Sequence, residues 1–252
     1  MRPIHIVGFG LWTPGFPDPT AWREGRPDPD VVKPPCRLVN ARLKRGSSRF
    51  ANMLGEVVEQ AATAASIDVT KVPTFYGSSL GEIETMVTLL RMLYEEEGKL
   101  SPNRFKNSVH NAASGLVSIG TENTAFSTAI AGGTRSFEAT LIEAWAYLEQ
   151  EGGSVILAVA DDRAPEPLDA LDDHEALAIG IALALEGDGP RLEGLRAGEP
   201  VDRNANLSAA LRASCASPGL ELLDAVLARR AGPVALSPLG GPQLVADLVL
   251  PA

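Results

Sequence analysis

Residues with nucleophilic or metal-binding side chains are few in this chain and widely spaced. The 252 residues include two cysteines, Cys36 and Cys215, and three histidines, His5, His110 and His174. A reactive cysteine needs a basic neighbour or a helix N-terminus that lowers its pKa, and neither cysteine has one nearby in the sequence. Two cysteines cannot form a four-cysteine zinc site, and the histidines show no HxH or HxxxH spacing. We therefore expect no metal, no cofactor and no disulfide framework.

Two dipeptides could support other chemistry. Asp161 and Asp162 end a buried apolar run, where paired carboxylates could act as general acid and base, but we interpret them as a solvated strand end. Gly132 and Gly133 could cradle a phosphate at a helix start, although a tight strand-to-helix turn explains them without a ligand. His174 follows two aspartates, and we expect it to be solvated.

The charge of the chain excludes some classes of partner. It carries 22 basic and 32 acidic residues, a net charge of −10, and a pI near 4.9. A nucleic-acid binder would carry the opposite sign, and an anionic membrane surface is disfavoured for the same reason. The N-terminal apolar run is too short for a signal peptide, and no run approaches about 18 apolar residues. We expect a cytoplasmic protein.

The order of apolar patterns predicts an α/β fold. Apolar spacing of three and four indicates helices, and short apolar runs between turn residues indicate strands. We expect strands at 4–10, 73–77, 124–130, 154–160, 176–185 and 244–250. We expect helices at 50–65, 82–97, 107–120, 135–150 and 206–230. This alternation is typical of a buried sheet covered on both faces.

We treat residues 1–252 as a single domain. Seven prolines between residues 13 and 40 forbid regular helix and indicate a long proline-rich arm. The stretch 186–205 is polar and rich in Gly and Pro, so a linker there is one alternative. The last strand still needs a partner strand, however, and no clean domain boundary emerges.

Several segments, in order, resemble the N-terminal half of β-ketoacyl synthases, which have the thiolase fold. The segment from Ser127 to Thr134 (STAIAGGT) is similar to the family's nucleophile elbow, and the segment from Asn107 to Gly115 (NSVHNAASG) resembles the helix that leads to it. Weaker similarities lie at 75–81, 100–102, 154–161, 175–185 and 237–243. The resemblance implies a thiolase-like layered αβα fold, truncated to roughly the N-terminal half plus a closing C-terminal turn and strand.

Two departures from the family pattern argue against condensing activity. The family's elbow carries a cysteine, and the matching position here is Ile130, which has no lone pair to attack a thioester. The family's two active-site histidines lie in its second half, and this chain has no histidine after His174. An imidazole pair that stabilises an oxyanion cannot be assembled from this chain. The protein is therefore expected to be an accessory subunit rather than an enzyme.

The short chain resembles nucleophile-less subunits of the chain-length-factor type. Such subunits pair with a catalytic ketosynthase in polyketide, aryl-polyene or fatty-acid-type chain elongation. The resemblance implies a dimer, with a ketosynthase or with a second copy, and contact with acyl-carrier protein only through that partner. The expected interface comprises Asn107, His110, Asn111, Ala112, Ala113, Ser114, Phe126, Thr128 and Ile130.

Two other functions remain open at this stage. One is a thioester hydrolase or acyltransferase that uses Ser114, Ser127 or Thr128 with His110. The other is a stand-alone acyl- or CoA-binding module, which would need a basic patch for phosphate groups. An acidic chain offers few such patches. The cluster Arg42, Lys44, Arg45 and Arg49 is the one local exception to the expected lack of a docking site for acyl-carrier protein, although a solvated helix entry explains it as well.

Overall fold

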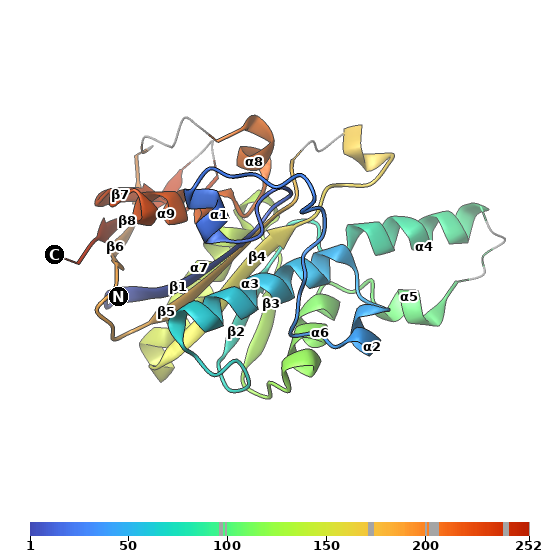
Figure 1. The fold of residues 1–252 in the computed structure, drawn as a ribbon, viewed down its shortest axis with the longest axis horizontal. Helices are drawn as coiled ribbons and strands as arrows, with labels where there is room; N and C mark the ends of the chain where they lie inside the picture. Colours follow the sequence, from blue (N-terminus) through green and yellow to red (C-terminus); the bar gives the residue numbers. More distant parts are fainter. Residues whose placement is uncertain are drawn as a thin grey trace.

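The computed structural model describes residues 1–95, 98, 100–170, 174–199, 201, 207–238 and 242–251. These residues form a mixed α/β fold (Figure 1). The strands are β1 (Ile4–Trp12), β2 (Thr74–Gly77), β3 (Ser127–Ile130), β4 (Ser154–Asp161), β5 (Leu177–Ala184), β6 (Arg191–Gly198), β7 (Gly232–Ala235) and β8 (Gln243–Val249). The α-helices are α1 (Pro19–Arg23), α2 (Ala41–Lys44), α3 (Arg49–Ala65), α4 (Ile83–Glu95), α5 (Pro102–Lys106), α6 (Ala112–Thr121), α7 (Ser136–Glu151), α8 (Ala209–Ala213) and α9 (Ser217–Leu227). Two short 3-10 helices are η1 (Gly133–Arg135) and η2 (Leu168–Ala170).

The strands form one sheet with the order β3-β2-β4-β5-β1-β6-β8-β7. Strand β2 pairs in parallel with β3 and β4, and the other pairings are antiparallel. Only two residue pairs, Ile4 with Leu192 and His5 with Arg191, join β1 to β6. This narrow junction links the first five strands to a C-terminal section made of β6, β8 and β7. The predicted α/β class is confirmed.

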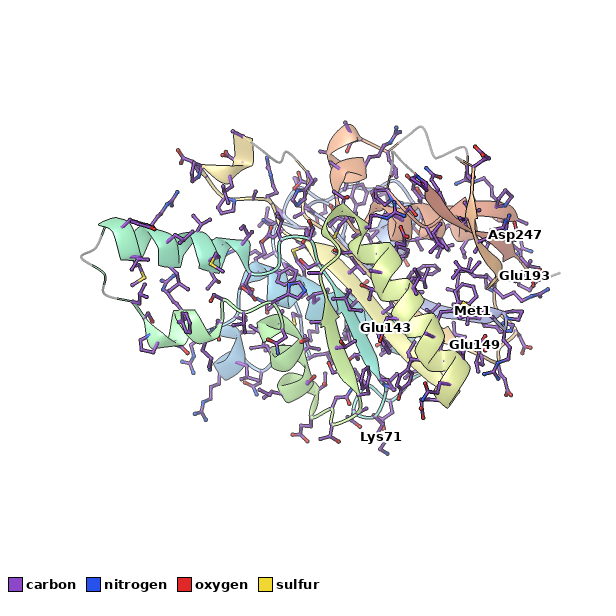
Figure 2. All side chains as sticks on the ribbon, turned by 180° about the vertical axis from the view of Figure 1, so that it is seen from behind. Met1, Lys71, Glu143, Glu149, Glu193 and Asp247 are labelled. Atoms are coloured by element: carbon purple, nitrogen blue, oxygen red, sulfur yellow. The ribbon has the colours of Figure 1, made fainter. Side chains whose placement is uncertain are left out.

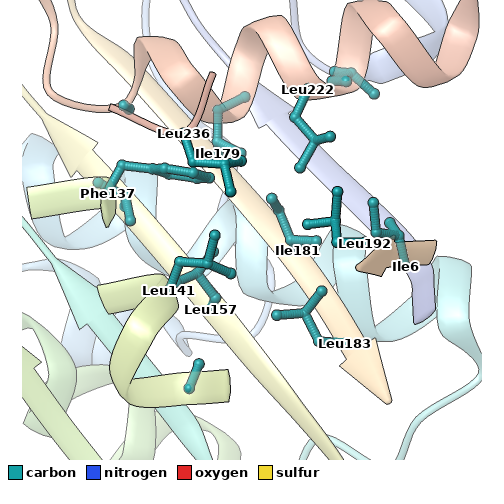
Figure 3. Close-up of a cluster of buried hydrophobic side chains, with 14 of the residues drawn as sticks. Ile6, Phe137, Leu141, Leu157, Ile179, Ile181, Leu183, Leu192, Leu222 and Leu236 are labelled. Carbon is teal, nitrogen blue, oxygen red and sulfur yellow. The ribbon is translucent and has the colours of Figure 1, made fainter. Parts of the chain in front are cut away.

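The larger core lies on the face of the sheet that carries α7 and α9. Figure 3 shows Phe137 and Leu141 of α7 and Leu222 of α9 packed against Ile179 and Ile181 of β5. Residues of β6 and β8 close the same core from the C-terminal section. The two helices therefore pack together on one face of the sheet, and α9 also contacts β7 of the C-terminal section.

Helices α3 and α6 cover the opposite face of the first five strands. Glycines let α3 approach closely: a Cβ at Gly10 would lie 2.3 Å from the carbonyl oxygen of Val57, and one at Gly180 would lie 2.2 Å from the same atom. Side chains at these positions would push the helix off the sheet. The second core is therefore thin, and alanines of β4 and β5 supply much of its sheet side.

The polar stretch 186–205, where a linker is one alternative, contains strand β6. On β6 and β8, Glu193 is the register partner of Asp247, and both lie on the same side of the molecule in Figure 2. Arg191 pairs with Glu193 at 3.2 Å, and Arg196 pairs with Asp247 at 2.7 Å. These charges suit a solvent-exposed face, and the irregular register between Glu193 and Arg196 breaks the alternation that predicts a strand.

Other expected boundaries also change. The proline-rich arm contains α1, because Asp18 caps that helix and Pro19 stands in its first turn, where proline is tolerated. The helix expected at 206–230 is two helices, α8 and α9, and its last residues give way to the unpredicted strand β7. The helix expected at 107–120 begins only at Ala112, and the strand expected at 124–130 begins at Ser127. The C-terminal part is therefore larger than a closing turn and strand.

Several expected features extend beyond the described residues, among them the stretch 186–205 at residues 200 and 202–205 and the helix expected at 206–230 at residue 206. The end of the helix expected at 82–97 includes Glu96 and Glu97, and the glycine-rich turn expected at 237–243 includes residues 239–241; these positions lie outside the described residues. Within the described part, α4 and α5 lie side by side and extend away from the sheet (Figure 1).

Candidate functional site

The segment that resembles a nucleophile elbow lies at one edge of the sheet. Strand β3 ends at Ile130, and η1 and α7 follow. The Ser136 hydroxyl donates a hydrogen bond of 2.7 Å to the carbonyl oxygen of Gly133 and accepts one of 3.1 Å from the amide of Gly132. A Cβ at Gly132 would lie 3.2 Å from the backbone of Arg135, and Gly133 has a φ of +58°. Tight turn geometry therefore requires this glycine pair.

Ile130 faces the helix that follows it. It is the register partner of Gly77 on β2, and a Cβ at Gly77 would lie 2.3 Å from the Thr140 hydroxyl of α7. Neighbouring residues in register point to the same face of a sheet. The half-buried Ile130 side chain therefore stands where the strand meets the start of α7, and it offers no group for covalent chemistry.

A buried polar cluster lies at the ends of β2 and β4. The Asp161 carboxylate accepts hydrogen bonds from the Ser78 hydroxyl at 2.5 Å and from the amides of Ser79 and Leu80, each at 3.0 Å. Asp161 is only 1% exposed. The expectation of a solvated strand end is therefore wrong for this residue, because its oxygens hold the turn after β2.

Cys215 belongs to the same cluster, which the sequence did not reveal. It lies between α8 and α9, and it interacts with the Asp161 carboxylate, the Ser79 backbone and the Ser136 side chain. Burial raises the pKa of the Cys215 thiol well above its usual range, and the neighbouring Asp161 carboxylate raises it further. Because the thiolate is the reactive form, Cys215 is not an activated nucleophile although it lies near the elbow.

The second aspartate of the pair is also buried. Asp162 forms an ion pair of 3.2 Å with Arg49 at the start of α3. Burial raises the pKa of Asp162, while Arg49 opposes that shift. His174 lies 2.9 Å from the backbone carbonyl oxygen of Asp162 and is 3% exposed, so the expectation that this histidine is solvated is also wrong. Both aspartates connect elements of the fold.

The residues expected at a partner interface differ in exposure: two are buried, two are exposed and five are half-buried. Ala113 and Ser114 are buried by this chain, where α6 packs against α3. Asn111 is exposed and Phe126 is 47% exposed. The remaining five lie half-buried at the surface, namely Asn107, His110, Ala112, Thr128 and Ile130. Ala113 and Ser114 therefore cannot present side chains to a partner.

Further exposed apolar side chains lie on the same elements or next to them in the chain. Phe126 stacks on Tyr147 with ring centroids 5.2 Å apart. Phe105, Val109 and Ile119 are 62%, 47% and 66% exposed. Strand β3 is at the end of the strand order, so its outer edge pairs with no described strand. The sequence pattern indicated β3 but not the exposure of Phe105 and Ile119 on α5 and α6 or of Val109 in the turn between them.

Among the described residues no metal-binding group forms, and the Ser114 hydroxyl is bound to the backbone rather than to His110. The described residues contain no group of three or more His, Cys, Asp or Glu side chains that could hold a metal ion. Within the same part of the chain, the Ser114 hydroxyl donates to the carbonyl oxygen of Asn111 at 2.9 Å, and no hydrogen bond joins it to His110. The described helices also include none with the length and apolarity needed to cross a membrane.

Comparison with known proteins defines the class of this protein. Residues 20–235 match the family model for the N-terminal domain of β-ketoacyl synthases. Because this match covers most of the chain, the protein belongs to that family. No curated protein matches it.

Solved structures share the fold at low sequence identity. A complex of the ketosynthase ApeO with its chain length factor ApeC from Xenorhabdus doucetiae contains a chain with 18% identity and a TM-score of 0.69, and the match covers 98% of this chain and 99% of that one. The ishigamide ketosynthase/chain length factor matches with 14% identity and a TM-score of 0.74 over 100% of both chains. A β-ketoacyl synthase from Burkholderia phymatum STM815 matches with 16% identity and a TM-score of 0.59 over 89% of this chain and 71% of that one.

Proposed function

We propose that this protein is a non-catalytic, chain-length-factor-like subunit that pairs with a catalytic β-ketoacyl synthase in polyketide, aryl-polyene or fatty-acid-type chain elongation. The observation that carries the proposal is Ile130 at the end of β3. The resemblance to ketosynthases implies a cysteine at this position. The buried, protonated Cys215 does not replace that nucleophile. Two similar structures, a ketosynthase in complex with its chain length factor and the ishigamide ketosynthase/chain length factor, support the same role.

The proposed partner surface is the free edge of β3 and the neighbouring part of α6 and its preceding loop. We call it the β3–α6 surface, and it comprises Asn107, Val109, His110, Asn111, Ala112, Ile119, Phe126, Thr128 and Ile130. An unpaired strand edge can pair with a strand of another chain, and the exposed Phe126 and Ile119 would lose water contact there. An obligate interface of this kind buries on the order of 2,000 Å² or more.

The acyl-carrier protein is proposed to dock on the partner. Carrier proteins of these pathways are expected to be acidic, and this chain has a net charge of −10. Like charges slow encounter and disfavour the bound state. This subunit would therefore shape the complex without providing the main docking site.

Co-expression with a ketosynthase from the same gene neighbourhood tests the proposal. We expect a stable heterodimer in size-exclusion chromatography with light scattering and in native mass spectrometry. Phe126→Asp should weaken it, whereas Val32→Asp, which places the same charge at an exposed position of the proline-rich arm, should not. A chain that stays monomeric at high concentration and ignores the ketosynthase would contradict the proposal.

A further inference from the structure

A polar pocket lies where the α4–α5 pair joins the body of the protein. It has a volume of about 450 Å³. Its walls come from the loop between α2 and α3, the first turns of α4, and α5. The pocket contains no residue of the elbow or of β3, and among its lining residues Asn107 alone also belongs to the β3–α6 surface.

The charge of this pocket is opposite to that of the whole chain. Arg45, Arg49 and Arg104 line it, and Glu84 is the one carboxylate among its lining residues. In the part of the chain that the structure describes, Arg45 and Arg104 form no ion pair. Two guanidinium groups from separate elements, neither in an ion pair with a described residue, thus line one cavity of an acidic protein, and arginines outnumber carboxylates in that lining, which favours an anionic occupant.

The third arginine is held in place by other contacts. Arg49 pairs with Asp162 at 3.2 Å, and its guanidinium carbon lies 5.2 Å from the centre of the Trp12 ring. Its Nε is buried and has no hydrogen-bond partner within the described residues. A fixed cation in the lining costs little conformational entropy when a ligand binds.

Hydrogen bonds between elements tie the walls together. The Asn107 side-chain amide donates to the carbonyl oxygen of Gly46 at 3.0 Å, which connects the end of α5 to the loop before α3. The Ser48 hydroxyl donates to the Glu82 carboxylate at 2.8 Å, which connects the start of α3 to the start of α4. The pocket is therefore largely formed before any ligand binds.

We infer that this pocket binds a small organic phosphate, such as a phosphate monoester or a diphosphate. Arginine guanidinium groups match phosphate oxygens with paired hydrogen bonds and carry a fixed charge. The volume is within the range of small-molecule sites and exceeds what a phosphate group alone requires. Asn103, Thr85 and Thr88 also line the cavity and suit a polar organic portion. This inference does not depend on the proposed subunit role.

Isothermal titration calorimetry on the purified full chain tests the inference, with ribose 5-phosphate and pyrophosphate as probes and ribose as the control compound. We expect saturable binding of at least one phosphate probe and none of ribose. Arg45→Ala and Arg104→Ala should each weaken binding by about tenfold or more, because a hydrogen bond to a charged group is lost. Arg42→Ala, which removes a nearby arginine outside the lining, should leave the affinity within about twofold of wild type.

Several results would overturn the inference. One is the absence of saturable heat with both phosphate probes at millimolar concentration. Another is equal loss of affinity in all three arginine variants, which would indicate a diffuse charge effect. In a third such result, neither small phosphate binds, but an acidic carrier protein does, and Arg45→Ala and Arg104→Ala weaken that binding. The first two results do not concern heterodimer formation or carrier-protein docking, so failure of this inference and failure of the proposed function are distinguishable. The third result would in addition contradict the proposal that carrier protein docks on the partner.

Discussion

The Ser78 hydroxyl donates a 2.5 Å hydrogen bond to the Asp161 carboxylate, and both residues are buried. This contact ties the turn after β2 to the end of β4, two strands that are neighbours in the sheet but lie about a third of the chain apart in sequence. The same carboxylate interacts with Cys215, so one acidic side chain joins the N-terminal strands to the C-terminal helices. Asp161 therefore stabilises the packing of the turn after β2 against the segment that contains Cys215.

Asp161→Ala should strongly destabilise the fold. The change leaves the buried Ser78 hydroxyl and the half-buried amides of Ser79 and Leu80 without their acceptor, and a fully buried unsatisfied group costs about 1–3 kcal/mol. We expect a loss of at least about 3 kcal/mol in the free energy of unfolding, measured by urea titration. Asp169→Ala, at an exposed position, is the control, and equal stability of the two variants would show that these hydrogen bonds are unimportant.

Ile130→Cys should introduce a modifiable thiol but no condensing activity. The side chain is half-buried at the surface, so iodoacetamide should add one label to the folded variant. The wild type should stay unlabelled, because burial raises the pKa of Cys36 to about 11 and that of Cys215 well above its usual range.

Intact-protein mass spectrometry after incubation with acyl- and malonyl-carrier protein should show no acyl adduct, since no histidine follows His174. An acyl adduct on the wild-type protein would contradict the non-catalytic proposal.

Ala113→Asp and Phe126→Asp should act on different processes. Ala113 is 1% exposed inside this chain's own core, so a charge there should cost about 3–5 kcal/mol of folding stability. Phe126 is 47% exposed, so Phe126→Asp should mainly weaken association with the ketosynthase while the subunit still folds. Circular dichroism melting and light scattering separate the two effects. A fully stable Ala113→Asp variant would mean that α6 does not pack on α3 as described.

The stability of the chain should depend on pH through Glu82. Burial raises the pKa of Glu82, although hydrogen bonds from Ser48 and Thr85 oppose the shift. The folded chain then binds this proton more tightly than the unfolded chain does, so stability decreases as pH rises from the unfolded value of 4.5 through the higher folded value. Glu82→Gln should make this decrease shallower in urea titrations across that window. Glu143→Gln, on the exposed side of α7 (Figure 2), should leave the slope unchanged.

The sequence by itself determined the central strands and helices and the family. Continuous apolar runs predicted β4 and β5, because strands buried on both faces need no polar alternation. Apolar spacing predicted α3 and α7, and local motifs around the elbow identified the ketosynthase resemblance with Ile130 in place of cysteine. These features depend on residues close together in the chain.

Only the tertiary structure decided which polar residues are buried and which apolar residues remain exposed. Asp161 and Asp162 read as a solvated strand end, yet partners distant in sequence, Ser78 and Arg49, surround them. Cys215 came to lie beside the elbow because α9 packs on the same face of the sheet as α7. Strand β6 escaped prediction because its polar face meets solvent and its register is irregular. Each outcome depends on long-range packing, which local spacing does not encode.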